Sequence, residues 1–199
     1  MDMLSHALWA DIGRRTMSGS SSEKRRLVGW LIAGALLPDV FHAIPVSIWA
    51  LLGTGNPWDA VLAYALATPG SEPPMPAWVV DISQVVHCSL HSAILAGLVS
   101  LLVWRGGNFQ LRYLMLGWWS HILIDTFTHS ADYYPVRTFY PLSEWSFDGW
   151  AWNSSTFIAT NYLLLGLVYF GIGLSRNRPW KSPERQNPEN ISRNAASIL

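Results

Sequence analysis

The chain alternates between long apolar stretches and shorter segments rich in polar and aromatic residues. The clearest apolar stretch, 155–174, runs for 20 residues without a charge, and about 20 residues are needed to cross a bilayer as a helix. Three more apolar stretches cover 27–37, 92–104 and 111–131. The first of them continues beyond Pro38. The pattern predicts an all-α integral membrane helical bundle with about four transmembrane helices.

The remaining segments complete this organisation. Residues 3–13, "MLSHALWADIG", predict a short N-terminal amphipathic helix that cannot span a bilayer alone, and Asp2 stands where a secretory signal is basic. Two aromatic stretches with Pro and Gly, 53–80 and 132–154, separate the apolar ones. We expect a membrane-embedded domain over 1–175 and a polar, disordered tail over 176–199.

The composition supports a membrane protein. Only 13% of the 199 residues are charged, against roughly 25% in average soluble domains, and the 12 tryptophans are typical of membrane–water interfaces. The net charge of zero argues against a nucleic-acid partner. A single cysteine, Cys88, excludes an internal disulfide and a thiolate zinc cage.

Basic residues indicate the orientation. Most lie in three places: 14–26, the segment "WRGGNFQLR" at 104–112, and 176–185. The positive-inside rule places all three, and the C-terminus, in the cytoplasm. Four spans fit this, although the region around Pro38 could also be a bent or re-entrant segment.

All six histidines have a histidine or carboxylate partner at helical spacing. The groups are Asp2/His6, Asp39/His42, His87/His91 and His121/Asp125/His129. Residues at i, i+4 and i+8 share one face of a helix. Because ionisable groups are costly inside a membrane, their presence needs a chemical reason.

These groups also share a predicted depth. Asp2, Asp39, His91 and Asp125 lie 13 or 14 residues from an arginine of the cytoplasmic segments (Arg15, Arg26, Arg105 and Arg112, respectively), or roughly 20 Å along a helix. Four separate segments could therefore deliver ionisable side chains to one level of the bilayer. A shared site would require such an alignment.

A divalent cation would explain the convergence, because helical bundles build metal sites from inward-facing histidines and carboxylates. Imidazole and carboxylate ligands without thiolate favour zinc, and also suit manganese, iron or nickel. The number of ligands allows one or two ions. The candidate metal ligands are His6, Asp39, His42, His87, His91, His121, Asp125 and His129.

Each motif alone has a simpler interpretation. A buried histidine is often a hydrogen-bonded core residue, and His87/His91 could be polar contacts between spans. "LPDVFH" could mark a helix end at Pro38, with Asp39 capping the next turn. Asp2 could be a helix N-cap. The equal depth of the groups is what favours a metal site.

The chain contains an ordered set of motifs. In chain order the motifs are His6, "LLPDVFH" (36–42), "HCSLHS" (87–92), "GWWSHILIDTFTH" (117–129) and "FYPLS" (139–143). The set resembles the membrane-bound metal-dependent hydrolases. That family is also described as LexA-binding, inner-membrane-associated hydrolases. More distantly, the motifs are similar to zinc-dependent phospholipase C. The resemblance covers about 1–145. It implies a helical protein of the cytoplasmic (inner) membrane, with His6, Asp39, His42, His91, His121 and Asp125 as ligands. Many members carry "HRGxTHS", from which "HCSLHS" departs, so the role of His87 is left open.

The favoured hypothesis is a membrane-bound metal-dependent hydrolase that acts through metal-activated water on an ester or phosphoester of a lipid or amphiphile. Asp39 or Asp125 would orient or deprotonate that water, and Arg137 could meet a phosphate. The main alternative is a metal-ion or proton transport protein using the same residues. A haem or quinone protein is a third hypothesis. The expected partners are the lipid bilayer and the amphiphilic substrate, and the sequence does not indicate an oligomeric state.

Overall fold

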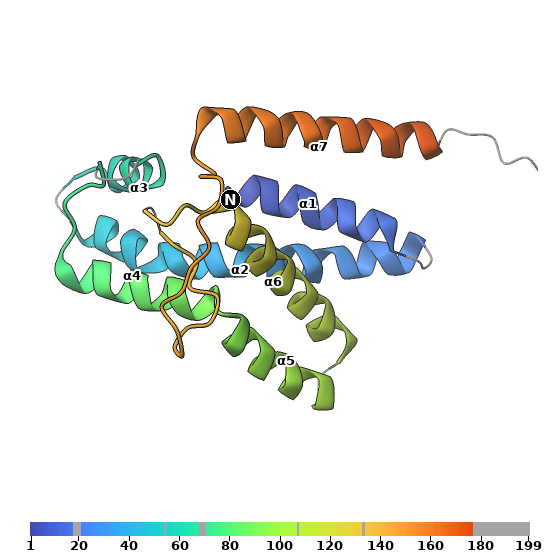
Figure 1. Ribbon diagram of the computed structural model, residues 1–199, viewed down its shortest axis with the longest axis horizontal. Helices are drawn as coiled ribbons and strands as arrows, with labels where there is room; N and C mark the ends of the chain where they lie inside the picture. Colours follow the sequence, from blue (N-terminus) through green and yellow to red (C-terminus); the bar gives the residue numbers. More distant parts are fainter. Residues whose placement is uncertain (18–20, 54, 68–70, 107, 133, 177–199) are drawn as a thin grey trace, which may run out of the picture. The chain divides into compact units, whose positions relative to one another are not determined.

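The computed structural model describes residues 1–17, 21–53, 55–67, 71–106, 108–132 and 134–176. These residues form seven α-helices and no strand, which confirms the all-α class (Figure 1). The helices are α1 (Met3–Thr16), α2 (Ser21–Leu52), α3 (Pro57–Ala65), α4 (Ala77–Leu90), α5 (Ala93–Gly106), α6 (Phe109–Thr128) and α7 (Ser155–Arg176). The predicted tail, 176–199, lies outside the described residues except for Arg176.

The chain divides into two compact units, Met1–Gly166 and Leu167–Leu199. The first contains α1 to α6 and the beginning of α7, together with every candidate ligand. The described part of the second unit is the remainder of α7.

Fewer helices qualify as membrane spans than the four that the sequence predicts. By length and composition, Leu27–Leu52 of α2 and Ser155–Ser175 of α7 could each cross a membrane. The pair α4 and α5 qualifies only as one span bent by 58° at its break, so the described residues contain two spans or up to three. The prediction of a span over 111–131 was wrong: α6 contains His121, Asp125 and several hydroxyl side chains, which lower its apolarity.

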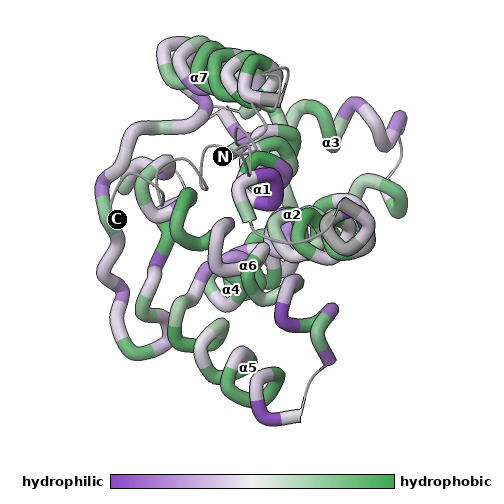
Figure 2. The backbone as a smooth tube through the Cα atoms, turned by 90° about the vertical axis from the view of Figure 1, so that its right-hand side faces the viewer, coloured by the Kyte–Doolittle hydropathy of each residue, from purple (hydrophilic) through white to green (hydrophobic). Residues whose placement is uncertain are grey.

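Exposed apolar side chains are compatible with membrane insertion. On α2, Phe41 is 50% exposed and Leu51 71% exposed, and on α7 Phe170 is 66% exposed. Green, hydrophobic segments recur along the helices in Figure 2. The helix α3 has no buried residue, so this part of the segment 53–80 is not a buried helix.

The helix α2 continues through Pro38 and Pro45. The interpretation of "LPDVFH" as a helix end was therefore wrong, and Asp39 and His42 lie on consecutive turns within one helix. A proline inside a helix removes one backbone donor but does not have to end the helix when neighbouring helices support it. The contacts of α2 with α1, α4 and α6 provide that support.

The N-terminal helix is present as predicted, and Asp2 is its N-cap. The Asp2 carboxylate accepts hydrogen bonds from the Ser5 backbone N–H at 2.9 Å and the Ser5 hydroxyl at 2.6 Å. Such a cap satisfies donors that the first helical turn leaves open. It confirms the simpler interpretation of Asp2, and α1 packs with its buried His6 towards α2 and α6.

Two glycines let α2 and α6 approach each other very closely. A Cβ atom on Gly34 would lie 1.9 Å from the Leu114 carbonyl oxygen, and one on Gly117 would lie 2.0 Å from the Leu31 carbonyl oxygen. Small residues at helix crossings permit this kind of backbone contact in membrane proteins. The crossing makes α6 the neighbour of α2 and fixes the positions from which both helices present their polar side chains.

The segment 132–154 is attached to the helix ends near these side chains. At the break between α4 and α5, the Ala93 N–H donates to the Thr138 carbonyl at 2.8 Å and the Ser92 hydroxyl donates to the Tyr140 carbonyl at 2.5 Å. At the end of α6, the N–H groups of Gly149, Trp150 and Trp152 donate to the carbonyls of residues 129, 127 and 128. These bonds satisfy carbonyls that a helix end leaves without partners.

We predict that Gly117→Ala destabilises the protein, because the added methyl group must force the two helix backbones apart. Overpacking of this kind costs about 3 kcal/mol. The measurement is the free energy of unfolding in detergent. Gly29→Ala, on the facing helix α2 with open space around its Cβ position, is the control and should gain up to about 1 kcal/mol. Equal stabilities for the two variants would contradict the close crossing.

Candidate metal centre

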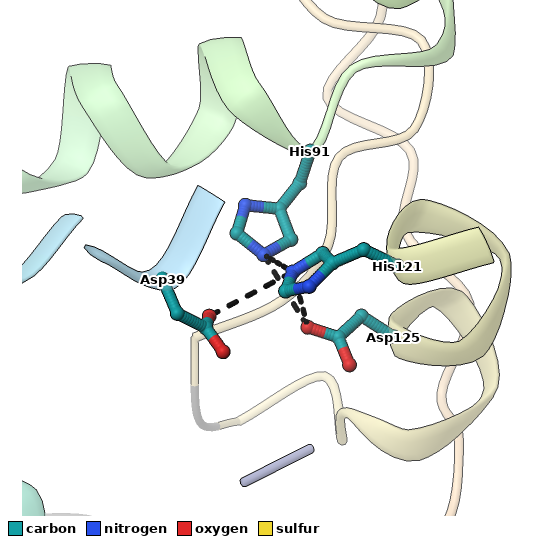
Figure 3. A group of neighbouring side chains, drawn as sticks. All are labelled: Asp39, His91, His121 and Asp125. Atoms are coloured by element: carbon teal, nitrogen blue, oxygen red, sulfur yellow. Dashed lines mark hydrogen bonds and ion pairs between the residues drawn. The ribbon is translucent and has the colours of Figure 1, made fainter. Parts of the chain in front are cut away.

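Four predicted ligands from three parts of the chain meet in the interior. Asp39 comes from α2, His91 from the residue that ends α4, and His121 and Asp125 from successive turns of α6 (Figure 3). One ligand atom from each lies within 4.8 Å of the other three. His91, His121 and Asp125 are fully buried, while the Asp39 side chain is 19% exposed. This cluster could hold a metal ion.

The spacing of the ligand atoms fits a cation. His121 Nε2 lies 2.9 Å from His91 Nε2 and 3.1 Å from Asp125 Oδ2, and His91 Nε2 lies 3.3 Å from the same Oδ2. Asp39 Oδ1 lies 3.7 Å from His121 Nε2. Ligands about 2.0–2.1 Å from a zinc ion are about 3.3 Å apart in a tetrahedron. Small adjustments of these side chains would therefore complete a four-ligand site.

Backbone carbonyls fix the tautomers of the two central histidines. His121 Nδ1 lies 2.7 Å from the Ala35 carbonyl oxygen, and His91 Nδ1 lies 2.9 Å from the His87 carbonyl oxygen. A carbonyl only accepts, so each Nδ1 must carry the proton. Each neutral ring then presents an unprotonated Nε2, the state that binds metal, and the carbonyls are the outer partners that orient such ligands.

This assignment leaves acceptors facing one another. Neither Nε2 can donate to the other across 2.9 Å, and the buried Asp125 Oδ2 has no hydrogen-bond partner. Three lone pairs directed at one buried point are unfavourable unless a positive charge lies between them. A metal ion would supply that charge, and so would a proton shared by the two imidazoles.

The other oxygen of Asp125 faces the N-terminal helix. His6 Nε2 lies 3.0 Å from Asp125 Oδ1, and the Met1 amino group donates to the same oxygen at 2.5 Å. The His6 ring stacks on His121 with centroids 3.9 Å apart. His6 is therefore beside the cluster but is not one of its four closely spaced residues.

The three remaining histidines line a cavity of about 430 Å³. One of them, His129, also lies beside the cluster, with its Nδ1 3.7 Å from Asp125 Oδ2. His42 Nε2 is 3.0 Å from the Tyr64 hydroxyl, which donates to the Tyr134 hydroxyl at 2.7 Å. Both tyrosines line the cavity, as do Asp39 and Asp2. Tyr134 has a positive φ of 48°, a strained conformation for a residue with a side chain, and such strain is found at functional sites.

Two groups near the cavity have shifted pKa values. Partial burial raises the pKa of Tyr134, although the hydrogen bond with Tyr64 opposes this. For Asp2, burial alone would raise the pKa, but the hydrogen bonds from Ser5 and Tyr162 together hold it below its usual value. At neutral pH, Tyr134 is therefore a phenol that can donate a proton, whereas Asp2 is a carboxylate.

The eight residues predicted as ligands thus fall into an inner and an outer set. The inner set is Asp39, His91, His121 and Asp125, with His6 against it, and the outer set is His42, His87 and His129. Sequence reasoning missed the carbonyls of Ala35 and His87 and the tyrosines at positions 64 and 134, for which spacing gives no signal. Arg137 lies 2.5 Å from Glu144 and does not line the cavity.

Comparisons with protein-family models, with curated proteins and with solved structures found no match to this chain. The resemblance to membrane-bound metal-dependent hydrolases therefore stays a prediction from the motifs. The function is inferred below from the geometry of the cluster.

We predict that His121→Ala abolishes tight binding of the cation at the inner set, because it removes the ring that touches all three other ligands. The measurement is the metal content of purified protein by elemental analysis. Ser120→Ala, on the same turn of α6, is the control, because its hydroxyl only donates to the Gly117 carbonyl. Unchanged metal content in the His121 variant would refute the assignment.

Proposed function

We propose that the protein is a membrane-embedded, metal-dependent hydrolase that acts on an ester or phosphoester of a lipid or amphiphile. The observation that carries the proposal is the meeting of two imidazole Nε2 atoms and two carboxylates whose protons and orientations suit a cation. A divalent cation bound there would lower the pKa of a water molecule and polarise the oxygen of the substrate. The resemblance of the motifs to the metal-dependent hydrolases supports the same reaction class.

The two aspartates differ in their surroundings, which suggests different roles. Asp125 is fully buried and makes its contacts to His6, His91 and His121, as expected of a ligand. Asp39 is partly exposed and lines the cavity, where it could meet a water or a substrate oxygen. We therefore assign Asp125, with His91 and His121, as a ligand, and Asp39 as the general base beside a fourth position that would be left open for water.

The cavity suits an amphiphile. Its lining combines four polar side chains, Asp39, His42, His87 and His129, with apolar ones that include Val46, Val61, Leu66 and Met3. Apolar walls around a few polar groups are typical of pockets that bind small molecules. Tyr134, whose phenol remains protonated, could donate a proton to the leaving group. Among the described lining residues there is no lysine or arginine, so a phosphate would depend on the cation for its positive partner.

The membrane location is part of the proposal. Two helices are long and apolar enough to cross a bilayer, and we propose the cytoplasmic membrane, with a cytoplasmic C-terminus, from the distribution of basic residues. A substrate whose apolar chain lies in the lipid could then enter the cavity laterally. Zinc is the metal that we favour for the mixed imidazole and carboxylate ligands.

We predict that the full chain in detergent micelles hydrolyses an amphiphilic ester from a panel of fluorogenic acyl esters and phospholipids. Chelation should abolish product formation and zinc should restore it. Asp39→Asn should lower the rate of hydrolysis about 100-fold or more. Ser47→Ala, later on α2 and beside the same cavity, is the control and should keep most of the wild-type rate.

The competing function is transport of a metal ion or proton through the same residues. It would give zinc or proton flux into vesicles that contain the protein, in the absence of any hydrolytic product. That result would overturn the hydrolase.

A further inference from the structure

His87 is a buried histidine without a hydrogen-bond partner on its side chain. It lies on the last turn of α4, its exposure is 2%, and neither Nδ1 nor Nε2 has a hydrogen-bond partner. Buried polar groups in native proteins are almost always satisfied. An imidazole that is buried and unpaired on both sides therefore needs a partner that the protein chain alone does not provide.

Two histidine rings lie close to the His87 ring. Its ring centroid lies 5.0 Å from that of His42 and 6.1 Å from that of His129. Two imidazoles that bind one zinc ion in a tetrahedral site have centroids about 5 Å apart, as follows from a zinc–nitrogen distance of about 2.0–2.1 Å, so His42 fits this spacing and His129 would have to move about 1 Å closer. The His91 ring, at 4.1 Å, is too close to fit that arrangement with His87. His91 belongs instead with His121.

Hydrogen bonds leave one unprotonated nitrogen on each of the two neighbours. His129 Nδ1 donates to the Asp125 carbonyl at 3.2 Å, so its Nε2 is the unprotonated atom. The Tyr64 hydroxyl donates its one proton to Tyr134, so His42 Nε2 must be the donor to Tyr64 and His42 Nδ1 is unprotonated. Both rings are therefore in a state that can bind a cation.

We propose that His42, His87 and His129 form a second cation site beside the inner set. The three residues come from α2, α4 and the end of α6, and all three line the cavity. Three neutral imidazoles select zinc or a similar transition metal rather than magnesium or calcium, which require oxygen ligands. The site deepens the proposed hydrolase and rests on that function for its chemical role, since it would place a second positive charge in the lining of the substrate cavity.

The test is the number of zinc ions per chain in the full-length protein, purified in detergent, loaded with zinc and freed of excess. We expect two ions for the wild type and one for His87→Leu, which replaces the imidazole with an apolar group of similar size. Gln84→Leu, one turn earlier on α4, should keep two ions. His121→Ala should lose the inner ion.

His42→Leu repeats the test from a different helix, so a folding failure of the His87 variant does not decide the outcome. One ion in the wild type that persists in both the His87 and His42 variants would overturn the second site and leave the hydrolase standing. Two ions retained in both variants would overturn it equally. No bound zinc in the wild type would overturn the second site and the proposed function together.

Discussion

The contact of α2 with α6 at Gly34 and Gly117 is the constraint on which the candidate site depends. Only without side chains at these positions can the two backbones lie within contact distance. The same proximity brings His121 Nδ1 to the Ala35 carbonyl, one residue beyond Gly34. That hydrogen bond turns Nε2 of His121 towards Asp39, one further turn along α2. A packing feature thus determines the protonation and direction of the central imidazole.

The break between α4 and α5 serves the same centre from the opposite direction. The helix ends at His91, whose Nδ1 donates to the carbonyl one turn earlier, so the ring stays in the interior at the end of α4. Hydrogen bonds from Ser92 and Ala93 to the 132–154 segment hold the break in place. A bent pair of helices is costly unless its free backbone groups are satisfied, and here the satisfied break positions a ligand. The outer histidines, His42, His87 and His129, line the cavity.

The sequence predicts much of the site because helical spacing places His121 and Asp125 on one face and carries Asp39 and His91 to a similar depth. It does not predict the division into inner and outer histidines, since that depends on the rotation and crossing of helices distant in sequence. The span over 111–131 was wrong for a different reason. Its leucines and isoleucines suggest lipid, but His121, Asp125 and the hydroxyl side chains of the same helix lower its hydropathy, and it does not qualify as a candidate span. The Gly34–Gly117 pairing and the carbonyl partners are likewise products of tertiary contact.

We propose that the imidazole nitrogens and carboxylate oxygens of the inner set hold a cation, because without it their lone pairs would face each other. The direct test is X-ray absorption spectroscopy at the zinc edge. It uses the His87→Leu variant loaded with zinc, so that the signal comes from the inner set alone. The account predicts a shell of two imidazole nitrogens and two oxygens at about 2.0–2.1 Å. An all-oxygen shell, a shell containing sulfur, or zinc bound in no fixed proportion to the protein would contradict it.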